Sequence, residues 1–226
     1  TQALLGLQLR YSWKELEPKE GVYNFSSIDK HLAELTKRNK RLVILLELKE
    51  MGTDETSMPI PAYARTAAYE GGAYSFSNYE KDVLRGYGTK LWNTKIHDRW
   101  VALVHALGKR YNSHPNFEAI GFTETSMGVP KEILSQEQIE IFYKNLLNIN
   151  REMRIHFPNT VTYQFVNYPR PVLESLVGQL KDMGTALGGP DVFLEEPGLL
   201  YSKVPKGIYH YYPDLSGAVP LMPSVQ

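Results

Sequence analysis

The stretch FEAIGFTETSMG, residues 117–128, decides how the rest of the chain is interpreted. Residues 119–122 form a short apolar run, and its aromatic and β-branched content and flanking glycine predict a buried strand rather than a helix. Glu124 follows, before small polar residues. In a barrel of parallel strands, side chains at the carboxyl ends of the strands face the substrate pocket. Glu124 is therefore a candidate catalytic residue, although pairing with a Lys or Arg at a strand end explains it equally well.

Hydrophobic runs and amphipathic segments alternate along most of the chain. Strands are predicted at residues 4–11, 42–48, 119–122, 161–166, 188–194 and 219–225. Helices are predicted from Ser26 through Leu35, around residues 100–107, from Ser135 to before Pro158, and at residues 173–180. This order predicts a parallel α/β sheet with helices outside, either a (β/α) barrel or an open doubly wound sheet. About six strands can be counted, fewer than the roughly eight of a closed barrel. The expected fold is a TIM-like barrel that is incomplete, with its first and last strands missing or unrecognised.

Residues 51–94 interrupt this alternation with a long stretch of little periodicity. Loops of such length in compact domains are usually functional or disordered, and the many aromatic residues here favour order. Because the stretch follows a predicted strand, we expect it to overhang the active face of the barrel. Residues 1–226 are then a single barrel domain with a long insertion at about 51–94.

The composition excludes several classes of protein. Lys plus Arg and Asp plus Glu are equal at 25 each, so no overall charge attracts the chain to nucleic acid or to an anionic membrane. No apolar run approaches the roughly 20 residues that a membrane-spanning helix needs. Cysteine is absent, which excludes disulfides and thiolate chemistry but leaves the compartment open, a secreted or periplasmic one included. The chain begins at Thr1 without Met, so we expect a processed or truncated chain.

The segment RYSWKELEPKEGVYNF, residues 10–25, resembles the second β/α unit of clan A glycoside hydrolases. In that clan W-x-x-L-E-P-x-x-G-x-Y-x-F followed by an Ile-Asp helix is a frequent signature. The similarity in order and spacing extends from about residue 6 to residue 226, and it includes uncharacterised bacterial barrel proteins with the order LEP, ET, GGPD, VQ. It implies a (β/α)8 barrel, lacking its first and eighth strands here, with Glu124 as general acid/base at the fourth strand.

Two positions depart from the clan pattern. Thr123 precedes Glu124 where the clan usually has Asn. Residues 220–226 should end in the nucleophilic Glu, yet they contain no carboxylate, and Gln226 lies close to that position. The resemblance therefore supports the fold more strongly than the activity, since barrels host many functions.

Glycoside hydrolysis requires two carboxyl groups, one to protonate the leaving oxygen and one to attack or to activate water. Partial burial at a strand end is expected to raise the pKa of Glu124 and suit it to the acid role. The sequence leaves its partner open among Asp191, Glu195, Glu196 and Glu47. Further pocket candidates, which fall at predicted strand ends, are Arg10, Trp13, Asn167, Tyr168 and Gln226. For Trp13, packing beneath the loop of Tyr23 and Phe25 is an equal alternative.

Other chemistries lack their motifs. The 6 histidines are scattered without H-x-H or H-E-x-x-H, so no metal site is expected, and no glycine-rich phosphate loop or other cofactor motif is present. Three hypotheses remain. The first is a glycoside hydrolase-like enzyme acting on an oligo- or polysaccharide, and the second is a non-catalytic carbohydrate-binding barrel that lacks the nucleophile. The third is a fragment whose open sheet edges pair in a homodimer.

Overall fold

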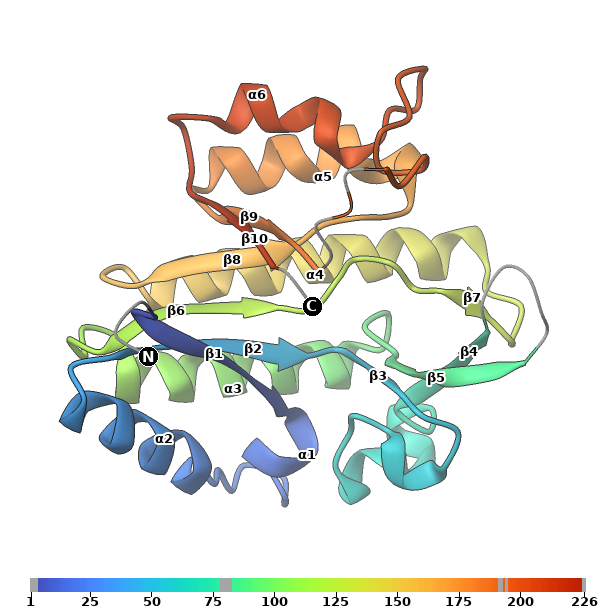
Figure 1. Ribbon diagram of the computed structural model, residues 1–226. Helices are drawn as coiled ribbons and strands as arrows, with labels where there is room; N and C mark the ends of the chain where they lie inside the picture. Colours follow the sequence, from blue (N-terminus) through green and yellow to red (C-terminus); the bar gives the residue numbers. More distant parts are fainter. Residues whose placement is uncertain (1–3, 78–82, 191–192, 194, 225–226) are drawn as a thin grey trace.

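The computed structural model describes residues 4–77, 83–190, 193 and 195–224 (Figure 1). Its strands are β1 (Gly6–Ser12), β2 (Arg41–Glu47), β3 (Lys49–Met51), β4 (Ala73–Ser77), β5 (Leu84–Thr89), β6 (Phe117–Phe122), β7 (Val129–Pro130), β8 (Val161–Phe165), β9 (Ala186–Gly189) and β10 (Leu221–Pro223). Its α-helices are α1 (Trp13–Leu16), α2 (Ser26–Lys37), α3 (Thr94–Tyr111), α4 (Gln136–His156), α5 (Arg170–Asp182) and α6 (Tyr212–Leu215). Short 3-10 helices lie at Glu55–Ser57, Ala62–Arg65, Ala67–Tyr69 and Ile208–Tyr211.

The main sheet has six parallel strands in the order β1-β2-β6-β8-β9-β10. It is curled, and helices α2 to α5 lie along its outer side (Figure 1). This is the predicted incomplete barrel, and the fold class is confirmed. The strand predicted at 188–194 begins earlier, as β9 at Ala186, and part of that range lies outside the described residues. The last strand is shorter than predicted and covers only Leu221–Pro223.

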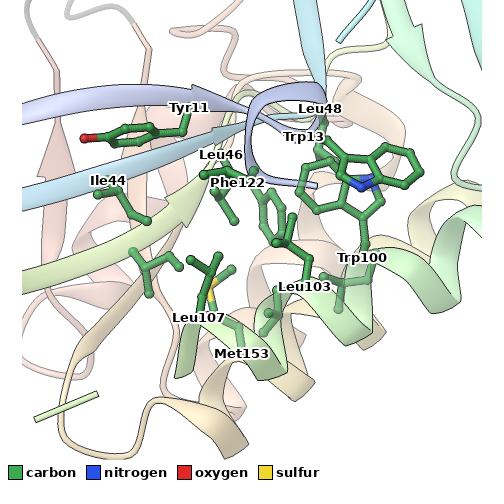
Figure 2. Packing of buried hydrophobic residues seen from close by; sticks show 14 of the residues in the cluster. Tyr11, Trp13, Ile44, Leu46, Leu48, Trp100, Leu103, Leu107, Phe122 and Met153 are labelled. Atoms are coloured by element: carbon green, nitrogen blue, oxygen red, sulfur yellow. The ribbon is translucent and has the colours of Figure 1, made fainter. Parts of the chain in front are cut away.

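The principal core lies between the sheet and these helices. Trp13, Trp100 and Phe122 are buried there together (Figure 2), with the Trp100 ring 5.4 Å from the rings of both the others. The apolar stripe of α4 that the sequence predicted faces this core, and the helix begins at the expected Ser135, which forms a capping box with Gln138.

The concave side of the sheet is filled by side chains rather than open. Tyr163 and Phe165 of β8 pack there with Leu45 and small residues of neighbouring strands. A Cβ at Gly121 would lie 2.5 Å from the Tyr163 ring, so glycine lets that ring lie over β6. Gln8 of β1 donates to the Tyr163 hydroxyl at 3.0 Å and accepts from Ser224, just after β10, at 3.4 Å. Gln8 of the first strand thus contacts both the central strand β8 and the residue that follows the last strand.

Residues 51–94 are not the structureless excursion that their lack of periodicity suggested. Together with β3 and β7 they build an antiparallel sheet in the order β3-β5-β4-β7. It lies beyond the carboxyl ends of β2 and β6 (Figure 1). The expectation that this stretch is ordered is confirmed, since Tyr74, Phe76 and Trp92 are buried in the principal core. The alternation was missed because β5 carries glycine where a Cβ at Gly86 would meet a β3 carbonyl oxygen at 2.2 Å.

Candidate functional site

Several predicted site residues gather at the carboxyl edge of the main sheet. Arg10 lies near the end of β1 and Glu47 is the last residue of β2. Glu124 follows the end of β6 by two positions, and Asn167 follows the end of β8 by two. Because β1, β2, β6 and β8 are consecutive parallel strands in the sheet, these side chains lie at one edge of it.

Glu124 forms an ion pair with a lysine. Its Oε1 lies 2.8 Å from the Nζ of Lys49, and the two side chains are 16% and 8% exposed. The same ammonium donates to the Ser126 carbonyl at 2.8 Å and lies 5.0 Å from the centre of the Phe76 ring. Lys49 was not among the candidates, and the only sequence signal for it was its place directly after the apolar strand 42–48.

Because of this ion pair, the pKa of Glu124 is shifted in the direction opposite to the expected one. Burial is the largest single influence and raises the pKa of the carboxyl. The charge and hydrogen bond of Lys49, a backbone hydrogen bond and the charge of Arg10 together lower the pKa of Glu124 below its ordinary value of 4.5. The prediction of a raised pKa was therefore wrong, because the sequence could not show that an ammonium is buried beside this carboxylate.

Glu47 has the opposite shift. Burial raises the pKa of its carboxyl, and the negative charge of Glu50 raises it further. The positive charges of Arg10, whose guanidinium lies 3.9 Å away, and of Lys14 oppose this, but the pKa of Glu47 stays above its ordinary value of 4.5. Leu46 and Phe122 are paired across β2 and β6, and Glu47 and Glu124 follow them by one and two positions. Neighbouring strands therefore carry two carboxyl groups whose proton affinities are shifted in opposite directions.

Asn167 and Tyr168 hold the loop that carries Glu124. The Asn167 side-chain oxygen accepts from the backbone N–H of Ser126 at 3.3 Å, and the Thr125 hydroxyl donates to the Tyr168 carbonyl at 2.7 Å. The Tyr168 hydroxyl in turn donates to a Glu196 carboxylate oxygen at 2.6 Å. A cavity of about 100 Å³ lies at this end of the sheet, and its lining includes Asn167, Tyr168, Glu196, Tyr209 and Tyr212. Hydrogen bonds thus join the loops that follow β6 and β8, and the cavity lies beside the loop after β8.

Thr123, which departs from the clan pattern, links the ends of neighbouring strands by hydrogen bonds. It is buried, its hydroxyl accepts from the backbone N–H of Leu48 at 3.1 Å, and its carbonyl accepts from Gln164 at 2.6 Å. A substrate therefore does not reach this side chain in the described structure.

Trp13 was predicted to line the pocket, but the structure buries it in the core. Its side chain is 0% exposed, packs against Trp100 and Tyr63, and donates to the buried Glu17 carboxylate at 2.8 Å. Glu17 also pairs with Arg99. The LEP segment of the signature therefore builds core contacts. Trp13 is a packing residue, as the alternative supposed, but its aromatic ring contacts are Tyr63 and Trp100 and not the Tyr23 and Phe25 rings.

The remaining candidates are divided. Glu195 is exposed, whereas its neighbour Glu196 is half-buried and accepts a hydrogen bond from Tyr168, so Glu196 suits a pocket better than Glu195 does. Asp191 and Gln226 lie outside the described residues, and their roles stay predictions. Among residues 4–77, 83–190, 193 and 195–224, no three His, Cys, Asp or Glu side chains gather as metal ligands would. In the same described part, no helix combines the length and apolar character of a membrane span.

Known structures resemble this chain, although no protein-family model and no curated protein matches it. A β-galactosidase from Bacillus circulans sp. alkalophilus matches with a TM-score of 0.55 and 12% identity over 84% of this chain and 36% of its own. A cold-adapted β-galactosidase from Rahnella sp. R3 gives a TM-score of 0.53 and 12% identity over 85% and 36%. Endo-glycoceramidase II from Rhodococcus sp. matches with a TM-score of 0.50 and 11% identity, over 96% of this chain and 64% of its own.

These similarities are similarities of fold. The predicted resemblance to clan A glycoside hydrolase barrels is confirmed in that respect. The chain spans 64% of the glycoceramidase and 36% of each β-galactosidase, so it corresponds to part of those proteins.

Proposed function

We propose that this protein is a glycoside hydrolase-like enzyme that cleaves a glycosidic bond in an oligo- or polysaccharide. The proposed site lies at the carboxyl ends of β2, β6 and β8. The observation that carries the proposal is the pair Glu47 and Glu124, whose pKa values are shifted in opposite directions at neighbouring strand ends. Two carboxyl groups in one site with separated proton affinities are the arrangement that acid/base assistance of glycoside cleavage requires. The glycosidase fold of the structural neighbours supports the same class.

The shifts support a division of roles that differs from the expected one. Glu47 keeps its proton to higher pH than Glu124, so it suits the donor that protonates the leaving oxygen as the C–O bond breaks. Glu124 is the carboxylate, which attacks the sugar or takes a proton from the attacking water. Arg10, near both groups, favours their ionised forms and helps to balance the two. Asn167, Tyr168 and Glu196 offer hydrogen-bonding groups to the sugar.

A second candidate function is sugar binding without cleavage. The observation that favours it is the ion pair of Lys49 with Glu124, because a carboxylate that is neutralised by a buried ammonium is a weaker nucleophile and base. In this alternative the strand-end groups bind hydroxyls of a glycan, and the site forms no product.

The two candidates are separated by turnover and binding measurements on matched variants. Hydrolysis is measured on a panel of 4-nitrophenyl glycosides and soluble polysaccharides, and binding by isothermal titration calorimetry on the same sugars. We expect Glu47→Gln and Glu124→Gln each to lower kcat by about 10²- to 10⁴-fold. Glu118→Gln is the control, because Glu118 lies at the other end of β6 in a surface pair with Arg41. We expect the acid limb of the pH–rate profile to report Glu124 and the basic limb Glu47.

One result would contradict the role given to Glu124, and another would contradict enzymatic activity itself. Unchanged turnover in Glu124→Gln would remove Glu124 from the chemistry. Glycan binding that survives both substitutions, with no product from any variant or from the unaltered protein, would establish the binding function instead.

A further inference from the structure

A cavity of about 360 Å³ opens beside the loop that carries Glu124. It lies among the loop after β6, the segment between β7 and α4, and α4 itself. Its lining includes the apolar side chains of Met127, Ile133, Leu134, Ile139 and Tyr143. Ile133 is 101% exposed, so it contributes nothing to the core of the protein. The volume falls within the range of roughly 300–1,000 Å³ that is usual for small-ligand pockets.

The polar backbone around this cavity already has partners in the protein. The contacts are Tyr143 Oη to the Thr125 carbonyl at 3.2 Å, Lys49 Nζ to the Ser126 carbonyl at 2.8 Å, Ser126 N–H to Asn167 Oδ1 at 3.3 Å, and Tyr74 Oη to the Met127 carbonyl at 3.2 Å. At the rim, the Glu132 carboxylate lies 3.0 Å from Lys90 Nζ. Because these groups are satisfied, a ligand gains chiefly by covering apolar side chains. The same contacts, from several elements, hold the cavity in one shape, which lowers the cost of binding.

Lys49 connects the cavity to the proposed catalytic carboxylate. Its ammonium contacts both Glu124 Oε1 and the carbonyl oxygen of Ser126, each at 2.8 Å, and Ser126 lines the cavity. A group in the cavity is therefore a near neighbour of a sugar bound at Glu124. We infer that the cavity binds an alkyl or aryl group attached to that sugar, so that the ligand is a glycoside with an apolar aglycone. The sugar half of this inference rests on the proposed function, whereas the apolar site does not.

The experiment compares ligands that differ only in apolar length. Dissociation constants of methyl, butyl and hexyl β-D-galactosides are measured by isothermal titration calorimetry on the unaltered protein and on Glu124→Gln. The free alcohols 1-butanol and 1-hexanol repeat the comparison without sugar, so that an unsuitable sugar does not hide the apolar site. We expect Kd to fall by about three- to fourfold for each added methylene that the cavity covers.

Matched variants locate the effect. Ile133→Ser and Ile139→Ala should each reduce the gain from butyl to hexyl, and from butanol to hexanol. Ile155→Ser is the control, because Ile155 is an exposed isoleucine of α4 at 59% exposure that does not line the cavity. Thermal unfolding midpoints of all three verify that they are folded, and Ile133 is the safest of them because its side chain is outside the core.

The outcomes for the cavity and for the enzyme are distinguishable. Equal affinity for short and long alkyl groups, absence of binding of every probe, or an alkyl gain unchanged in both cavity variants would overturn the apolar site. An alkyl gain that depends on Ile133 and Ile139, found together with no hydrolysis of any glycoside, would support the apolar site and reject the enzyme. Hydrolysis of a glycoside without any gain in affinity from longer alkyl groups would support the enzyme and reject the apolar site.

Discussion

Lys49 Nζ lies 2.8 Å from Glu124 Oε1, and this contact joins the inserted sheet to the main one. Lys49 is the first residue of β3, whereas Glu124 stands beyond the end of β6. The second sheet thus supplies the counter-ion of a strand-end carboxylate in addition to covering that end of the barrel. The ion pair fixes the charge of Glu124, and several consequences can be measured.

Lys49→Met should destabilise the protein and raise the pKa of Glu124. Removing one partner of a largely buried pair leaves the other charge uncompensated, and we expect a loss of about 3 kcal/mol in unfolding free energy at neutral pH. Urea unfolding measures the loss, and a ¹³C carboxyl titration measures the pKa. Lys37→Met, which breaks the exposed i,i+3 pair with Glu34, is the control and should have no measurable effect. Equal stability of both variants would contradict the role assigned to Lys49.

Glu124→Gln should change how stability depends on acid. Because the folded-state pKa of Glu124 lies below 4.5, its carboxylate contributes stability that is fully present above that pH. The contribution disappears as pH falls through the folded-state pKa. The variant should therefore be less stable than the unaltered protein near neutral pH, with a difference that narrows below pH 4.5. Urea titrations across that range test this, and a difference that does not vary with pH would contradict it.

Glu47→Gln should change the pH dependence of stability in the direction opposite to that of Glu124→Gln. The folded-state pKa of Glu47 lies above 4.5, so its protonated form contributes stability that is fully present below that pH and is lost as pH rises through the folded-state pKa. Replacing it by a neutral amide avoids this loss. Relative to the unaltered protein, the variant should be more stable near neutral pH than it is below pH 4.5. The same urea titrations serve, and a shift parallel to that of Glu124→Gln would show that the two carboxyls are not divided as proposed.

Gly121→Ala should destabilise the concave side of the sheet. The added Cβ would lie 2.3 Å from the Tyr163 carbonyl oxygen and 2.5 Å from its ring, and a backbone atom in a central strand cannot easily move. We expect a loss of about 2 kcal/mol, measured by thermal unfolding. Gly178→Ala in α5 is the matched control, because no atom would lie within 4 Å of its Cβ. That variant should gain about 0.5–1 kcal/mol from helix propensity. If both variants behaved alike, the packing of Tyr163 over β6 would not be as described.

Prediction from the sequence succeeded where local pattern and burial coincide. The near-continuous apolar strand before Lys49 and the apolar stripes of α3 and α4 are set by residue spacing, so their types were predicted correctly. It failed for the inserted sheet, where glycines in β5 replace the alternating side chains that normally mark a strand. It also left the role of Trp13 undecided, because the sequence motif is the same whether its tryptophan lines a pocket or packs in the core.

The sequence by itself determined the alternation of strands and helices, the parallel sheet and the placement of Glu47 and Glu124 at strand ends. These follow from apolar periodicity, which acts through neighbours along the chain. Only the tertiary structure decided that Lys49 pairs with Glu124, that Glu47 and not Glu124 holds its proton more tightly, and that Trp13 is buried. The proton affinity of a carboxyl depends on burial and on charges within a few ångströms, and residues 49 and 124 become neighbours only when the two sheets pack together.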